Sequence, residues 1–145
     1  MMLSTKGRYA VIAVLDIAIN EHNGLVNLHQ IAKRQGISLR YLEQIFSKLK
    51  QANIVSSEKG PRGGYKLMAE KNLISIKAII DAVGEKTDMT RCGNNPEKWC
   101  LSGKKCITHE LWEGLNEQID KYLGGLFLHD VINHNILVIN KVNKL

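Results

Sequence analysis

The segment from Asn27 to Gln51, NLHQIAKRQGISLRYLEQIFSKLKQ, decides the fold of this chain. Asn27 with Gln30 resembles a capping box for a short helix, and Gly36 ends that helix because glycine tolerates the left-handed C-terminal position. Ser38 then caps an amphipathic helix whose apolar residues are spaced by threes and fours. This inward face consists of Leu39, Leu42, Ile45, Phe46 and Leu49. A short helix, a glycine turn and an amphipathic helix predict a helix-turn-helix at about residues 28–51.

A β-hairpin is predicted directly after the helix-turn-helix. Residues 54–58 and 65–68 have the composition of two short strands, and the glycine-rich stretch between them is typical of a turn. A hairpin at this place is a wing, at about residues 54–68. The tip lacks the Lys-Ser/Thr pair of a Walker loop, so we do not interpret it as a nucleotide site. Its residues suit contact with a DNA minor groove or with phosphates: Lys59, Gly60, Pro61 and Arg62.

Two further helices are predicted on either side of this unit. Ser4 or Thr5 can cap the first, with Lys6 and Arg8 near an N-terminus that favours phosphate. Its apolar stripe is Ala10, Val11, Val14, Leu15 and Ala18. Ser75 caps the second, whose face of Ile76, Ile79, Ile80 and Val83 closes a core. We therefore expect a mainly α fold with a small β-hairpin, in which residues 1–84 form a winged helix-turn-helix DNA-binding region.

The length and the charge of the chain agree with a nucleic-acid-binding protein. The 145 residues suffice for one core, and no apolar run approaches the roughly 20 residues that span a bilayer. The N-terminus lacks a secretory signal, so we expect a cytoplasmic protein whose thiols stay reduced. The net charge of +6 lies entirely in residues 1–72, which hold 11 Lys and Arg against 5 Asp and Glu. This distribution suggests a polyanionic partner for that half, although a merely basic, solvated surface would explain the charge as well.

All three cysteines and one histidine lie within residues 92–109. Cys92, Cys100, Cys106 and His109 make a complete four-ligand set for a soft or borderline metal, in a loop rich in Gly, Asn and Ser. Buried structural thiols, a disulfide with one thiol left over, and a Cys106–His109 nucleophile pair are alternatives. The spacing is not the paired Cys-x-x-Cys pattern of zinc sites, so the residues alone leave these possibilities open.

A long helix is predicted from a cap at Thr108 to about Leu123. Its apolar residues occupy two faces, and little chain remains to cover them, which indicates pairing with a second copy. These dimerisation residues are Leu111, Trp112, Leu115, Ile119 and Tyr122. Residues 126–137 are expected to fold back as a short apolar helix, and the tail from Asn140 to fray. The predicted division is thus 1–84 for DNA, 85–109 for the ligand loop and 110–145 for the dimerisation helix and tail.

A dimer would present two recognition helices to a roughly palindromic site in double-stranded DNA. Outward Gln44 can pair with adenine and Arg40 with guanine, in bidentate geometry. Ser38 and Tyr41 can contact phosphate or a base edge. Each of these side chains could instead be plain helix surface.

Several segments resemble the IscR-type winged-helix transcription factors, bacterial regulators that carry iron–sulfur clusters. They are residues 3–11, LSTKGRYAV; 35–46, QGISLRYLEQIF; 55–65, VSSEKGPRGGY; 90–92, TRC; and 106–112, CITHELW. The resemblance implies a homodimer that holds one 2Fe–2S cluster per subunit through Cys92, Cys100, Cys106 and His109. It also implies repression of cluster-assembly genes by the loaded form, a second set of DNA sites for the cluster-free form, and the assembly machinery as cluster donor.

The chain differs from that family in a first ligand gap two residues longer, in Arg40 where a small hydroxyl residue is common, in Lys59 for a wing arginine and in a shorter tail. A zinc-dependent regulator, a thiol-redox regulator, a winged helix for RNA or protein, and a Cys-His thiol enzyme remain alternatives, the last lacking a third catalytic partner.

Overall fold

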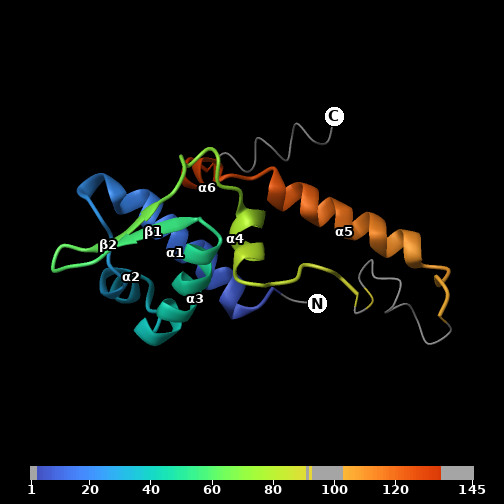
Figure 1. Ribbon diagram of the computed structural model, residues 1–145. Coiled ribbons are helices and arrows are strands. Elements are labelled where there is room, and N and C mark those ends of the chain that lie inside the picture. The colour runs from blue at the N-terminus through green and yellow to red at the C-terminus, as the bar shows by residue number, and fades with distance from the viewer. Residues whose placement is uncertain (1–2, 91, 93–102, 135–145) are drawn as a thin grey trace.

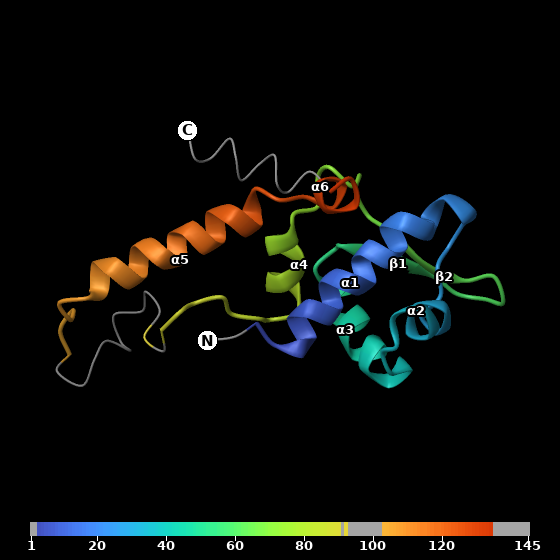
Figure 2. The ribbon, with the colours of Figure 1, turned by 180° about the vertical axis from the view of Figure 1, so that it is seen from behind.

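The computed structural model describes residues 3–90, 92 and 103–134. The elements follow in the order α1 (Thr5–Asn20), the 3₁₀ turn η1 (Glu21–Asn23), α2 (Leu28–Gln35), α3 (Leu39–Gln51), β1 (Val55–Glu58), β2 (Gly64–Leu67), α4 (Ile76–Ala82), α5 (His109–Gly124) and α6 (Leu128–Ile132). Figures 1 and 2 show a body made of α1–α4 and α6, with the β1–β2 hairpin extending at one end and α5 at the other. The predicted fold class, mainly helical with a two-stranded antiparallel wing, is confirmed.

The capping residues that the sequence singled out place the helix-turn-helix as predicted. The Asn27 side chain accepts from the Gln30 amide at 2.9 Å, and the Gln30 side chain accepts from the Asn27 amide at 3.1 Å, which completes the capping box. Gly36 ends α2 in the left-handed region, with φ 66° and ψ 32°. Ser38 Oγ then accepts from the Tyr41 amide at 3.2 Å and begins α3.

One hydrophobic core lies between α1, α3, α4 and α6. The predicted faces of α3 and α4 supply its centre, whereas Val11, Leu15 and Leu39 are half-buried at its edge. On α1 the buried face also includes Ala13 and Ile17, which the predicted stripe omitted. Fully or almost fully buried side chains of this core are Ala10, Val14, Ile17, Ile31, Leu42, Ile45, Phe46, Leu49, Ile79, Ile80 and Val83.

The wing is joined to the segment that leads into α2. β1 and β2 pair antiparallel from Val55 with Leu67 to Glu58 with Gly64. Val26 forms a bridge with Tyr65 through backbone hydrogen bonds of 3.0 Å and 2.7 Å. Gly64 allows this approach, because a Cβ there would lie 2.8 Å from the carbonyl carbon and oxygen of Val26. The wing therefore has a defined orientation relative to the helix-turn-helix.

The chain returns to the core after α5. The Ile76 amide donates to the Leu126 carbonyl at 2.8 Å, and the Leu128 amide donates to the Ile74 carbonyl at 3.1 Å. Leu126 and Leu128 are buried in the core that α1, α3 and α4 form. Within the described residues the predicted fold-back helix is α6, shorter than the 126–137 expected, and the predicted tail lies outside them. The three-part division of the chain stays a prediction, with residues 126–128 now placed beside the first part.

Candidate DNA interface and cysteine-histidine segment

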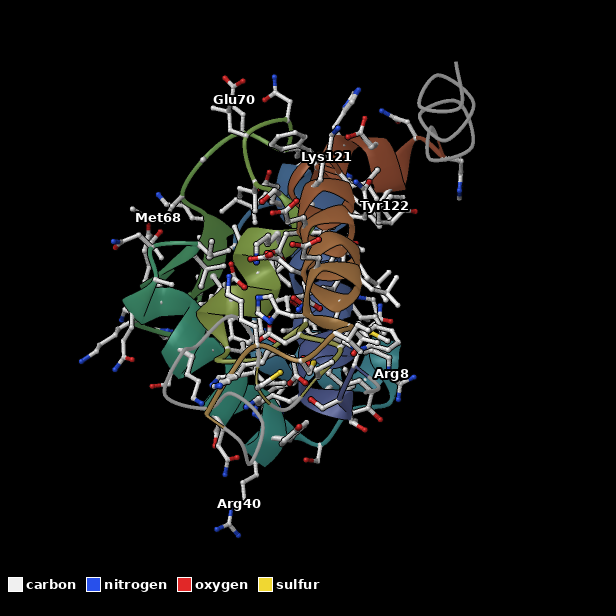
Figure 3. The ribbon with its side chains drawn as sticks, turned by 90° about the vertical axis from the view of Figure 1, so that its right-hand side faces the viewer. Arg8, Arg40, Met68, Glu70, Lys121 and Tyr122 are labelled. Carbon is white, nitrogen blue, oxygen red and sulfur yellow. The ribbon has the colours of Figure 1, made fainter. Side chains whose placement is uncertain are left out.

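The residues predicted to read DNA lie on the outer side of α3. Arg40 and Gln44 are exposed, whereas Leu42 and Ile45 on the other side are buried. The Ser38 oxygen accepts the Tyr41 amide, so this side chain caps the helix while its hydroxyl proton remains a donor. Figure 3 shows Arg40 pointing away from the body, on the side opposite Glu70 and Lys121.

The beginning of α1 lies beside this part of α3. Tyr9 and Tyr41 meet edge to face, with ring centroids 5.8 Å apart and an interplanar angle of 77°. Lys6 lies one turn before Tyr9 and is half-buried. Arg8 directly precedes Tyr9 and is exposed. In Figure 3 Arg8 and Arg40 both lie in the half of the molecule away from Glu70. The structure therefore places the predicted phosphate contacts of α1 next to the predicted base contacts of α3.

The predicted wing contacts lie at the tip of the hairpin. Lys59, Gly60, Pro61 and Arg62 are all exposed, at the end of the hairpin farthest from α5 in Figure 1. The Gly63 amide donates to the Gly60 carbonyl at 2.9 Å and closes the turn. Two cations on a narrow exposed tip can reach a phosphate or a groove without a change in the core.

A buried carboxylate that the sequence reasoning missed joins α1 to α2. Asp16 accepts two hydrogen bonds from Arg34, at 2.6 Å and 3.0 Å, and one from Gln35 at 2.8 Å, while Asn20 lies at 3.4 Å. Burial raises the pKa of Asp16, but these hydrogen bonds outweigh it and the pKa lies below its usual value. The same bonds raise the pKa of Arg34. An acidic residue between Ala13 and Ile17 on an apolar helix face is the signal that could have revealed it.

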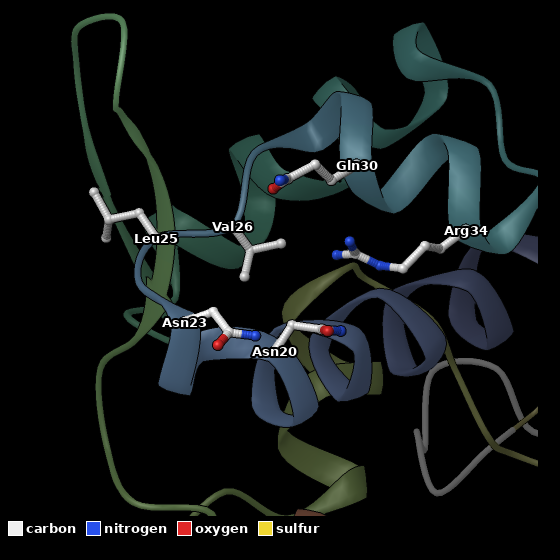
Figure 4. A pocket seen from close by; sticks show the side chains of 6 residues that line it. All are labelled: Asn20, Asn23, Leu25, Val26, Gln30 and Arg34. Atoms are coloured by element: carbon white, nitrogen blue, oxygen red, sulfur yellow. The ribbon is translucent and has the colours of Figure 1, made fainter.

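A small polar pocket adjoins this ion pair. Figure 4 shows Arg34 and Gln30 of α2 above Asn20 and Asn23, with Leu25 and Val26 at its end. Its volume is about 100 Å³. Pockets that bind organic ligands usually measure about 300 Å³ or more, so this one has room for a few water molecules and no effector of that size.

The predicted ligand segment is described at its two ends. Cys92 and Cys106 are half-buried, His109 is buried, and Cys100 lies outside the described residues. Thr90 Oγ1 lies 3.3 Å from Cys92 Sγ, and Thr108 Oγ1 lies 3.4 Å from Cys106 Sγ. Each hydroxyl can therefore donate to a thiolate beside it. Among residues 3–90, 92 and 103–134, no three His, Cys, Asp or Glu side chains are gathered as a metal site.

The helix that follows this segment begins where predicted, but Thr108 does not cap it in the expected way. Among the described residues, no first-turn amide of α5 donates to the Thr108 side chain. Thr108 Oγ1 instead accepts from Trp112 Nε1 at 3.2 Å, with the backbone at φ −97° and ψ 6° rather than extended. Thr108 is therefore the N-cap residue as predicted, but its hydroxyl is shared between Trp112 and Cys106 instead of accepting a first-turn amide.

Residues 85–90, which we call the strap, lead from α4 to Cys92 along α5. The Met89 amide donates to Asn116 Oδ1 at 2.8 Å, and Asn116 is buried. Thr87 Oγ1 lies 3.3 Å from a carboxylate oxygen of Asp120. Lys77 of α4 lies 3.1 Å from Asp81 of the same helix and 3.1 Å from Asp120 of α5, so it links the two helices. Burial lowers the pKa of Lys77, but the two carboxylates outweigh this effect and the pKa lies above its usual value. The strap therefore has a defined place on α5.

The outer side of α5 is apolar. Leu111 is 60% exposed, and Trp112, Leu115 and Tyr122 are exposed to between 37% and 42%, whereas Ile119 is half-buried. In Figure 3, where α5 projects toward the viewer, Lys121 and Tyr122 are labelled near the end of this helix that joins the body. In the described part of the chain, no helix is both long enough and apolar enough to cross a membrane.

The Rrf2 family model, described as an iron-dependent transcriptional regulator, matches residues 3–134. The HTH-type transcriptional regulator IscR of Erwinia tasmaniensis is 43% identical over 139 residues, which are 96% of this chain and 83% of that protein.

Solved structures agree with this match. CymR, the global cysteine regulator of B. subtilis, has a TM-score of 0.78 at 28% identity, covering 92% of this chain and 98% of its own. IscR of T. potens has a TM-score of 0.75 at 32% identity, covering 93% and 88%. These relatives are transcriptional regulators, not enzymes, which confirms the predicted class of function and the predicted resemblance. With its exposed helix-turn-helix and wing, the chain belongs to the Rrf2 family of iron-dependent, DNA-binding transcriptional regulators.

Proposed function

We propose that this regulator controls genes for iron–sulfur cluster assembly, as a repressor whose DNA affinity depends on a 2Fe–2S cluster. Cys92, Cys100, Cys106 and His109 would hold one cluster per subunit. The observation that carries the proposal is the position of this donor set. It lies on the segment that leaves the DNA-binding core after α4 and ends on the first turn of α5.

The donor set fits such a group in its chemistry. Three thiolates and one imidazole are ligands that iron–sulfur clusters accept, and the hydroxyls of Thr90 and Thr108 can donate to the sulfurs of Cys92 and Cys106. When bound, the cluster would supply a signal that depends on iron supply and redox state. His109 is held at the start of α5, so the fourth ligand is fixed to a rigid element.

The DNA contacts that we propose follow from exposure. Gln44 and Arg40 would contact base edges in the major groove, with Ser38 and Tyr41 at a base edge or phosphate. Lys6 and Arg8 would bind phosphate, and the wing tip, residues 59–62, would contact the minor groove or backbone.

We further propose that the exposed side of α5 is the homodimer contact. Leu111, Trp112, Leu115 and Tyr122 leave an apolar surface that a second copy would bury, with Ile119 at its edge. The two recognition helices would then face a roughly palindromic operator. The cellular cluster-assembly machinery would donate the cluster.

Anaerobic reconstitution tests the cofactor. The wild-type chain should take up two irons and two sulfides per subunit, with visible absorption that three single Cys→Ala variants and His109→Ala lose or shift. Stoichiometric zinc in anaerobically purified protein, without sulfide, would contradict the proposal and favour a structural metal. A Cys–Cys disulfide with no metal would favour a thiol-redox regulator.

A comparison of DNA selected by the apo and loaded protein tests the regulatory role. Different operators, or the same operator with different affinities, are expected. Steep salt dependence on duplex DNA separates this function from binding of a protein partner.

A further inference from the structure

The carboxylate of Glu85, the first residue of the strap, accepts hydrogen bonds from the N-terminus of α1. The Ser4 amide donates to Glu85 Oε1 at 3.1 Å, and the Ser4 hydroxyl donates to Glu85 Oε2. Ser4 is also the N-cap of α1, since its Oγ accepts from the Gly7 amide at 3.4 Å. One serine therefore caps the helix and joins it to a residue 81 positions later.

Gly7 leaves room for this contact. A Cβ at Gly7 would lie 3.2 Å from Cγ of Glu85 and 3.0 Å from Cδ1 of Leu3. Glycine at this position therefore leaves space for the Glu85 side chain beside the first turn of α1.

The other end of the strap leads to the proposed ligand segment. Met89, three residues before Cys92, is anchored to Asn116 of α5. Between Glu85 and this anchor lies an apolar cavity of about 180 Å³, lined by Leu3, Lys86, Thr87, Met89, Ile119 and Leu123. Figure 2 shows the strap running from α4 beneath α5, past the start of α1. Because polar contacts hold the strap over a cavity, its position can change without opening the core.

The start of α1 is where Lys6 and Arg8 are placed to meet phosphate. Glu85 therefore lies between the Cys92 end of the strap and one of the DNA contacts. A shift at Cys92 would reach α1 through the strap, separately from α5.

We infer that Glu85 is the residue that couples the state of the cysteine-histidine segment to the DNA-contacting start of α1. It acts as a positioning residue through Ser4, and it touches neither DNA nor cluster. The inference rests on the proposed function, which supplies the two states to be coupled.

The test compares operator affinity of the cluster-loaded and apo forms in four variants. Coupling energies of 1–3 kcal/mol correspond to affinity ratios of about 5 to 150. We expect such a ratio for the wild type, and a ratio near 1 for Glu85→Ala with cluster content unchanged. Asp88→Ala, which removes a carboxylate from the same strap, is the matched control and should keep the wild-type ratio.

A pair of changes that moves the negative charge from residue 85 to residue 4 separates coupling from helix stability. Ser4→Asp keeps an N-cap acceptor but repels the Glu85 carboxylate, so the ratio should collapse. Adding Glu85→Gln gives that aspartate an amide donor and should restore most of the ratio. In the apo protein, the amides of residues 5–8 should exchange with deuterium faster in Glu85→Ala than in Asp88→Ala.

The outcomes distinguish the two proposals. An unchanged ratio in Glu85→Ala, with normal cluster content, would overturn the coupling role and leave the proposed function intact. If the wild type takes up no cluster, or has equal affinity in both states, the proposed function fails and the coupling role fails with it.

Discussion

The ion pair between Asp16 and Arg34 should stabilise the fold strongly at neutral pH. In Asp16→Asn the side chain keeps its shape but loses its charge, and its NH2 group places a donor opposite a donor N–H of Arg34. The Asp16 side chain is 1% exposed, and breaking a buried pair costs about 3–5 kcal/mol. Arg34 is 37% exposed and can be hydrated after the change, so the lower end, about 3 kcal/mol, is expected. At about 3 °C per kcal/mol, Tm should fall by roughly 10 °C.

The pH dependence of this loss is fixed by the sign of the pKa shift. Burial acts to raise the pKa of Asp16, but hydrogen bonds from Arg34, Gln35 and Asn20 lower it by more than burial raises it. The pKa in the folded state therefore lies below the pKa in the unfolded state. The stability that the carboxylate contributes is therefore fully present above the unfolded pKa of about 3.9 and is lost as pH falls through the folded value. The Tm difference between wild type and Asp16→Asn should shrink below about pH 4.

Thermal unfolding followed by circular dichroism between pH 7 and pH 3 checks this. Asp81→Asn is the matched control, because Asp81 is 52% exposed in its pair with Lys77 and should change stability by less than about 1 kcal/mol. Equal Tm values for wild type and Asp16→Asn at pH 7, or a difference that stays constant down to pH 3, would refute the reasoning.

Three other changes have expected outcomes. Gln44→Ala should weaken specific DNA binding by roughly 1–3 kcal/mol, whereas Arg8→Ala should weaken all sequences about equally and reduce the salt slope; equal losses on non-specific DNA for both would contradict the assignment. Gly64→Ala should lower stability by about 1–3 kcal/mol in chemical denaturation, since its Cβ would lie 2.8 Å from the Val26 backbone, and an unchanged midpoint would show that the wing can move aside. Leu111→Asp should make the protein monomeric in sedimentation without lowering monomer stability, because Leu111 is 60% exposed; Glu117→Lys on the same helix serves as control.

Local signals were enough to predict the helix-turn-helix and the wing. Asn27, Gly36 and Ser38 each act on hydrogen bonds within a few residues, so their roles can be read from spacing. The ligand candidates followed from residue chemistry in the same way. Thr108 is the N-cap residue of α5 as predicted, but its side chain makes no cap hydrogen bond because the hydroxyl has a competing partner in Trp112, one turn away.

The contacts that join distant segments could not be predicted. Glu85 meets Ser4 across most of the winged helix, and Asn116 meets Met89 across the ligand segment, so no short spacing marks either pair. Asp16 is intermediate: its place on an apolar helix face indicates a buried partner, but not which residue. The packing of Leu126 and Leu128 into the first core likewise depends on where α5 directs the chain.

The return of the chain to the core after α5 affects how the length of the segment between Cys92 and Cys100 can vary within the family. Val83 and Leu126 both lie in the core, and the hydrogen bonds of Ile74 and Ile76 join the two ends of the chain between them. The entropy of closing such a loop grows only with the logarithm of its length, about 0.6 kcal/mol per doubling. A two-residue insertion between Cys92 and Cys100 therefore costs the fold almost nothing. The spacing of the proposed ligands can therefore change in the course of evolution while the helix-turn-helix and the wing stay unchanged.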